Sequence, residues 1–146
     1  MVAVEQPTPV RHWTGTFVAD EAVVPIVRHN ARSQLGKWGW DVNGAHAGDV
    51  LLVLTELVAN AIRHGSGPGD SVVVCLDETG GICQVEVQDS RPDRLLPKVF
   101  TARGEHGRGL ILVDRLALAV GVTTTVTTKK VWASVGLADD TPGVTQ

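Results

Sequence analysis

Cysteine and basic charge are both scarce in this chain, and each shortage excludes a class of protein. The 146 residues include two cysteines, which are too few for a disulfide framework and fit a cytoplasmic protein with reduced thiols. The formal net charge is −3, which argues against direct binding of nucleic acid, because affinity for phosphate backbones comes from clustered Lys and Arg. The five histidines are scattered without the spacing of a zinc site.

Long apolar runs and targeting segments are missing as well. No run approaches the roughly 20 apolar residues that span a bilayer, and the first residues lack the basic-then-apolar order of a secretory signal. The sequence therefore predicts no membrane contact. Its length suits one domain, which we place at residues 12–138, after a flexible leader (1–11) and before a polar tail (139–146).

Hydrophobic periodicity predicts the order strand, two helices, hairpin, helix, hairpin. This order suits a two-layer α+β sandwich. The expected elements are a strand over 12–19, helices over 21–38 and 45–64, strands over 71–78 and 82–90, an exposed loop over 91–107, a helix over 108–121, and strands over 121–128 and 130–137.

The second expected helix carries a narrow polar stripe opposite its apolar face. At about 100° per residue, Glu56, Asn60 and Arg63 lie close together around the axis, with Asp49 and His64 beside them. Most such stripes are solvated faces, but Asn is a poor helix former with little reason to sit in mid-helix. Glu and Asn on neighbouring turns can together hold Mg²⁺, directly or through its waters. Alternatively, Asn holds the ion while Glu polarises a nucleophile.

A second feature is "GEHGRGL", residues 104–110, where three glycines precede a helical apolar pattern. Glycines at a helix start let backbone N–H groups approach an anion, and Arg108 adds a positive fork suited to phosphate. A flexible loop explains the glycines equally well. The pattern GxxxxGK[ST] is absent and the glycines do not follow directly on a strand, so any phosphate site needs another architecture.

A third feature is Asp89, which ends the expected strand just before Pro92. An aspartate in this place is most often a surface turn residue. If the side chain points into a pocket instead, its carboxylate can accept a hydrogen bond from an exocyclic amine such as that of adenine.

In this order, E-L-V-x-N-A-x-x-H, a strand-terminal Asp and G-R-G-L resemble the GHKL ATPase superfamily. Within it, the chain resembles the short anti-sigma-factor serine/threonine kinases of bacteria, over roughly residues 17–135. The resemblance implies a Bergerat-type two-layer sandwich with a mixed, mainly antiparallel sheet and helices on one face. It also implies ATP and Mg²⁺ as cofactors, a sigma factor and an anti-sigma-factor antagonist protein as partners, and a possible homodimer.

The resemblance also assigns roles to individual residues. Glu56 matches the catalytic base, Asn60 matches the Mg²⁺ ligand, and Asp89 matches the residue that binds the adenine amino group. Arg63 is expected to face the nucleotide or the partner, and residues 91–106 would form the ATP lid. The remaining nucleotide-binding candidates are the second glycine box and its flanks: Gly104, Gly107, Arg108, Gly109 and Leu110.

One departure from the family pattern leaves alternatives open. The first glycine box usually reads D-x-G-x-G, but this chain has "DSRPD", with Arg91 and Pro92 in place of small residues. That change favours a non-catalytic, nucleotide-dependent switch, whereas Glu56 favours catalysis, because a pure binder needs no base there. A detached histidine-kinase-type ATPase domain is a third possibility. The closing "TTKKVW" lacks the family's Gly-Lys turn, so Lys129 and Lys130 receive no role.

Overall fold

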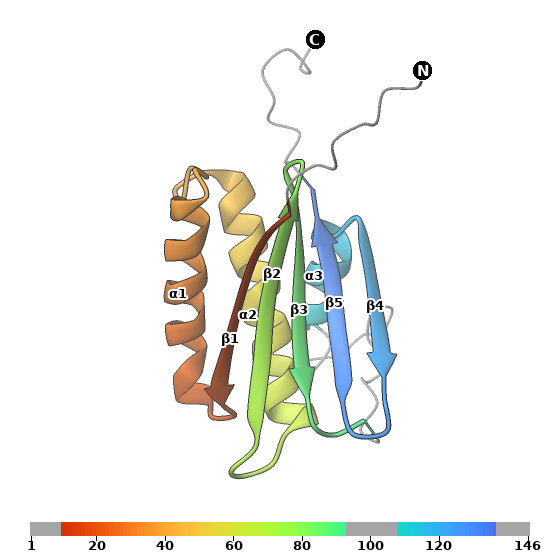
Figure 1. Ribbon diagram of the computed structural model, residues 1–146. Helices are drawn as coiled ribbons and strands as arrows, with labels where there is room; N and C mark the ends of the chain where they lie inside the picture. Colours follow the sequence, from red (N-terminus) through yellow and green to blue (C-terminus); the bar gives the residue numbers. More distant parts are fainter. Residues whose placement is uncertain (1–9, 93–107, 137–146) are drawn as a thin grey trace, which may run out of the picture.

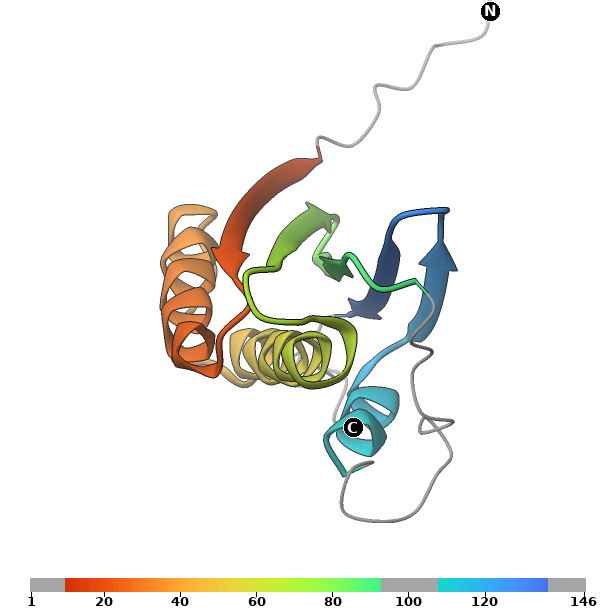
Figure 2. The same ribbon diagram turned by 90° about the horizontal axis from the view of Figure 1, so that it is seen from below.

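The computed structural model describes residues 10–92 and 108–136, in which one β-sheet carries all the helices on one face (Figures 1 and 2). This arrangement confirms the expected two-layer α+β sandwich. The elements in chain order are β1 (Arg11–Val18), the 3₁₀ turn η1 (Glu21–Val23), α1 (Val24–Lys37), α2 (Ala45–Gly65), β2 (Ser71–Thr79), β3 (Ile82–Asp89), α3 (Arg108–Leu116), β4 (Ala119–Thr124) and β5 (Lys129–Val135).

The sheet has the strand order β1-β2-β3-β5-β4, and all four described pairings are antiparallel. The β2–β3 hairpin forms where the sequence predicts it, because Gly80 and Gly81 both adopt positive φ (58° and 84°). A two-residue loop with positive φ at both positions matches the right-handed twist of the flanking strands. The β4–β5 hairpin then folds back so that β5 lies beside β3, which aligns the ends of these two strands.

The core lies between the sheet and α2, the central helix of the helical layer (Figure 2). Strands β2 and β3 alternate buried and half-buried residues, as expected for a sheet with one covered face. Leu54, Leu57 and Val58 of α2 are completely enclosed in this layer. Burial of each such side chain contributes about 1.5–3 kcal/mol relative to exposure, so α2 is held firmly against the sheet.

By length and mean hydropathy, α2 is long and apolar enough to cross a membrane, although it contains no unbroken apolar run of that length. Its most apolar window is 61% buried inside the protein, and a core helix meets the same criterion. Contacts of α2 with α1, α3 and the sheet explain its apolar character without a bilayer.

The third predicted helix, over residues 108–121, is too long. Helix α3 ends at Leu116, and Ala119–Gly121 pair with β5 instead. The Leu118 amide donates to the Ser134 carbonyl at 2.7 Å, so the chain already pairs with β5 two residues after α3 ends. Gly121 lies directly beneath the ring of Trp132, because a Cβ there would come within 2.4 Å of Trp132 Cζ2. Sheet pairing and this close approach outweigh the local helical pattern.

Candidate functional site

The polar stripe on α2 exists, and its members have different surroundings. Asn60 is 8% exposed and Glu56 is half-buried, one turn apart on the same helix. Arg63 is mostly exposed, and its Nε lies 3.2 Å from Oε1 of Glu21 in η1. Asn60 and Arg63 are separated by about 60° around the helix axis. Arg63 thus faces away from the core, and its contact with the nucleotide or the partner stays a prediction.

Asp89 is not a surface turn residue, because its side chain is completely buried at the end of β3. The Arg91 amide donates to Oδ1 at 2.9 Å. Oδ2 lies 3.4 Å from Nζ of Lys129, yet it accepts no hydrogen bond of normal geometry from the described residues. Burial raises the pKa of the Asp89 carboxyl above its usual value, against the opposing effects of the Arg91 amide and the Lys129 charge.

The last residue of α2 lies directly against this carboxylate. A Cβ built on Gly65 would come within 2.0 Å of Oδ2 of Asp89, so no larger residue fits there without displacement. Gly65 thus ends α2 and also makes room for the Asp89 carboxylate. The next residue, Ser66, buries its hydroxyl without a hydrogen-bond partner among the described residues. The end of α2 and the end of β3 therefore meet at a small buried polar site.

Lys129, a residue with no role predicted from the sequence, completes this site. It is the first residue of β5, stands directly opposite Asp89 across the β3–β5 pairing, and is 1% exposed. Lys130 projects to the other face of the sheet, where its Nζ lies 3.8 Å from Oε2 of Glu86. Strand alternation could have found Lys129, because it shares its side with the buried Val131 and with the rest of the apolar face of β5.

Arg91, where the family expects a small residue, ties two loops together. Its Nε lies 3.1 Å from Oδ2 of Asp70, which also accepts from the Gly67 amide at 2.7 Å. The segment Gly67–Asp70 is a tight turn closed by the Asp70 amide and the Gly67 carbonyl, with Gly69 at φ 85°. The Gly67 amide, and after it the Arg91 side chain, holds the pKa of Asp70 below its usual value.

The second glycine box is described only in part. The backbone of Arg108, Gly109 and Leu110 forms the first turn of α3, which starts where the sequence predicts a helix start and packs against α2 (Figure 2). The side chains of this turn, together with Gly104, Gly107 and lid residues 93–106, lie outside the described residues. Their assignment to the phosphate site stays a prediction.

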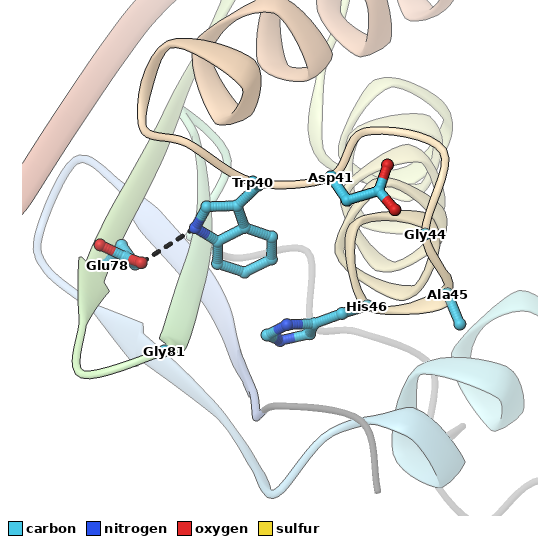
Figure 3. A pocket seen from close by; sticks show the side chains of 7 residues that line it. All are labelled: Trp40, Asp41, Gly44, Ala45, His46, Glu78 and Gly81. Carbon is cyan, nitrogen blue, oxygen red and sulfur yellow. Dashed lines mark hydrogen bonds between the residues drawn. The ribbon is translucent and has the colours of Figure 1, made fainter. Parts of the chain in front are cut away.

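A cavity of about 320 Å³ lies at the other end of α2 (Figure 3). Trp40 forms its wall, stacks on His46 with ring centroids 4.2 Å apart, and donates from Nε1 to Oε2 of Glu78 at 2.9 Å. Asp41 accepts from the Asn43 amide at 3.1 Å. None of the predicted site residues lines this cavity.

Comparison with known families decides the identity of the domain. Residues 17–135 match the model of the histidine kinase-like ATPase domain. The chain belongs to this family. No curated protein matches the chain. The match covers nearly all of the described residues, so α2, the end of β3 and α3 belong to a fold that in this family binds ATP.

The residues present fit an adenine nucleotide. Oδ2 of Asp89 accepts no hydrogen bond from the described residues, so it can accept one from an amino group, and the absence of a side chain on Gly65 lets the end of α2 lie directly against it. From Gly65, Asn60 lies about 7.5 Å and Glu56 about 13 Å back along the α2 axis. This is the order of base, phosphate chain and terminal phosphate along ATP. Among the described residues no group of three His, Cys, Asp or Glu forms a metal site, so Mg²⁺ would be shared between Asn60 and phosphate oxygens.

Proposed function

We propose that this protein is a cytoplasmic, ATP-binding bacterial anti-sigma factor that phosphorylates a serine or threonine of its antagonist protein. Membership of the histidine kinase-like ATPase family supports nucleotide binding. The observation that carries the proposal is the buried, hydrogen-bond-free Oδ2 of Asp89 beside Gly65, at the end of the helix that bears Glu56 and Asn60. A buried acceptor without a hydrogen bond calls for an explanation, and an amino-group donor from a ligand supplies one.

In this proposal each residue does one task. ATP is the phosphoryl donor, and the amides of Gly107, Arg108 and Gly109 stabilise its charge. Asn60 would hold Mg²⁺, which would neutralise further charge on the phosphates. Glu56 takes the proton from the substrate hydroxyl while that oxygen attacks the γ-phosphorus, and ADP leaves. Little covalent chemistry is asked of the protein, so positioning and electrostatics provide most of the rate.

A nucleotide-dependent switch without catalysis is the second candidate, and one contact favours it. Arg91 stands where the family has a small residue and is bound to Asp70, which links the segment after β3 to the loop after α2. A change in the segment after β3 on nucleotide binding would be transmitted to that loop. In this reading Glu56 contributes nothing to function.

Phosphoryl transfer separates the two candidates. The full chain is incubated with labelled Mg-ATP and candidate antagonist proteins, and the unsubstituted protein is compared with Glu56→Ala. Loss of a general base should lower the transfer rate by roughly 10²–10⁴-fold with little change in nucleotide affinity. Asp49→Ala, on the same helix stripe, is the control and should transfer at the normal rate. Equal transfer by the Glu56 variant, or no transfer by either form, would favour the switch.

The partner surface in this proposal is the edge of the molecule where α2 meets η1. Arg63 and Glu21 form an exposed ion pair where α2 meets η1, on the side of the stripe away from the sheet. A sigma factor or the antagonist would contact this edge. A homodimer would use β1 and α1, because β1 is an edge strand with unpaired backbone groups on its outer side.

A further inference from the structure

The buried ion pair between Lys129 and Asp89 has a consequence for nucleobase choice. The two residues face each other across the β3–β5 pairing, their side chains are 1% and 0% exposed, and Nζ and Oδ2 are 3.4 Å apart. A carboxylate buried this completely is costly unless a positive charge is beside it. The pairing register brings that charge to Asp89, because β5 starts opposite the end of β3.

Protonation of Asp89 would reverse what the site recognises. An ionised carboxylate only accepts hydrogen bonds, whereas a protonated one also donates. The amino group of adenine is a donor, and the corresponding carbonyl oxygen of guanine is an acceptor. A charged Asp89 therefore selects adenine, and a neutral Asp89 can accept either base.

The groups around Asp89 act in opposite directions on its charge, and Lys129 is the cation that lies against its carboxylate. Burial favours the neutral form, Asp70 in the α2–β2 loop acts in the same direction, and the Arg91 amide and Lys129 oppose them. The Arg91 guanidinium is directed to Asp70, and Gly65, which lies directly against Oδ2, carries no side chain.

We propose that Lys129 is a positioning residue for nucleobase selection, which holds Asp89 in place and in its charged form so that the site takes adenine in preference to guanine. The inference rests on the proposed ATP-binding function and extends it to a residue outside the assigned site. Lys129 acts through Asp89 and needs no contact with the nucleotide.

The experiment measures binding of Mg-ADP and Mg-GDP to the full chain by calorimetry between pH 6 and pH 9. The unsubstituted protein should prefer ADP throughout. Lys129→Met should lose roughly 10- to 100-fold of that preference at pH 7, the worth of one hydrogen bond to a charged group, and regain part of it at pH 9 as Asp89 ionises. Lys130→Met is the matched control and should retain the preference, because Lys130 lies on the other sheet face.

Different outcomes overturn different statements. If folded Lys129→Met keeps the normal ADP preference at every pH, the inference fails while ATP binding stands. If the unsubstituted protein binds neither nucleotide, the proposed function fails and the inference with it. If Lys129→Met does not fold, the carboxyl ¹³C shift of Asp89 in the unsubstituted protein decides: an ionised carboxylate at pH 7 supports the inference, and a protonated one overturns it.

Discussion

The two ends of α2 hold two different kinds of polar site. At its start, the cavity groups bind one another: Trp40 donates to Glu78 and stacks on His46. At its end, Oδ2 of Asp89 and the hydroxyl of Ser66 are buried and accept or donate no hydrogen bond within the described residues. The first site is a cavity of about 320 Å³. The second is built on a buried carboxylate whose counter-charge, Nζ of Lys129, lies 3.4 Å from Oδ2.

This contrast separates the cavity from the residues that the family pattern nominates, since the two lie at different ends of α2. The Trp40 indole and the Glu78 carboxylate already bind each other, so a ligand there must replace the hydrogen bond that it breaks. A buried polar group without a partner costs the folded protein about 1–3 kcal/mol, which a ligand can return. The site at the end of α2 therefore has the stronger physical reason to bind something.

The largest expected effect on stability comes from breaking the ion pair at the end of β3. Lys129→Met should lower the free energy of unfolding by about 3–5 kcal/mol at pH 7, because Asp89 without its counter-charge must either stay charged in a buried place or take up a proton. Urea denaturation measures the change. The loss should shrink as the pH falls, since protonation removes the uncompensated charge. Lys130→Met should stay within about 0.5 kcal/mol of the unsubstituted protein, and equal losses for both variants would contradict the comparison.

A smaller effect follows from filling the space beside Asp89. Gly65→Ala should cost about 1–3 kcal/mol through overpacking and weaken Mg-ADP binding, because its Cβ would lie 2.0 Å from Oδ2. Gly48→Ala is the matched control within α2, since nothing lies within 4 Å of its added Cβ. That substitution should stabilise the protein by up to about 1 kcal/mol. Thermal unfolding and calorimetry test both variants. If Gly65→Ala changed neither stability nor affinity, the end of α2 and the end of β3 would not be in tight contact.

Much of the fold follows from local patterns. The alternation of β2 and β3, the two glycines of their hairpin and the periodicity of α1 and α2 each predict the element that forms. The failure at 108–121 has a tertiary cause, because Ala119–Gly121 join the sheet only when β5 lies beside them. No local signal in a run such as "LALAVG" distinguishes the end of a helix from the start of a strand.

The site divides in the same way. Glu56, Asn60 and Asp89 belong to a recognisable order of residues, so the sequence suffices to nominate them. Lys129 does not, because its meaning depends on the register that places it opposite Asp89. Likewise, "DSRPD" looks like a damaged glycine box until the structure shows Arg91 bound to Asp70. Contacts between residues far apart in the chain, such as these two, cannot be predicted from the sequence without the fold.

The other end of α2 offers a variant that should leave nucleotide binding intact. Trp40→Phe keeps the ring against His46 but removes the Nε1 donor to Glu78, which should cost about 1 kcal/mol of stability. Glu78 remains partly compensated by Arg11, whose Nε lies 3.7 Å away. Affinity for Mg-ADP should not change. A fall in affinity comparable to that of Gly65→Ala would mean that the two ends are coupled through the helix.

The smallest expected effect concerns the turn that Arg91 holds against the end of α2. The pKa of Asp70 is lowered from its ordinary 3.8, so its contribution to stability is fully present above that pH and is lost as the pH falls through the lowered value. Asp70→Asn removes this contribution, and the stability difference from the unsubstituted protein should therefore vanish in strong acid. Arg91→Gln removes the effect of the guanidinium on the pKa of Asp70 but leaves that of the Gly67 amide. It should therefore flatten the pH dependence less than Asp70→Asn does. Because both side chains reach solvent, added salt should weaken the Arg91 effect, whereas a difference that persists below the lowered pKa would show that the Asp70 charge is not what holds the turn.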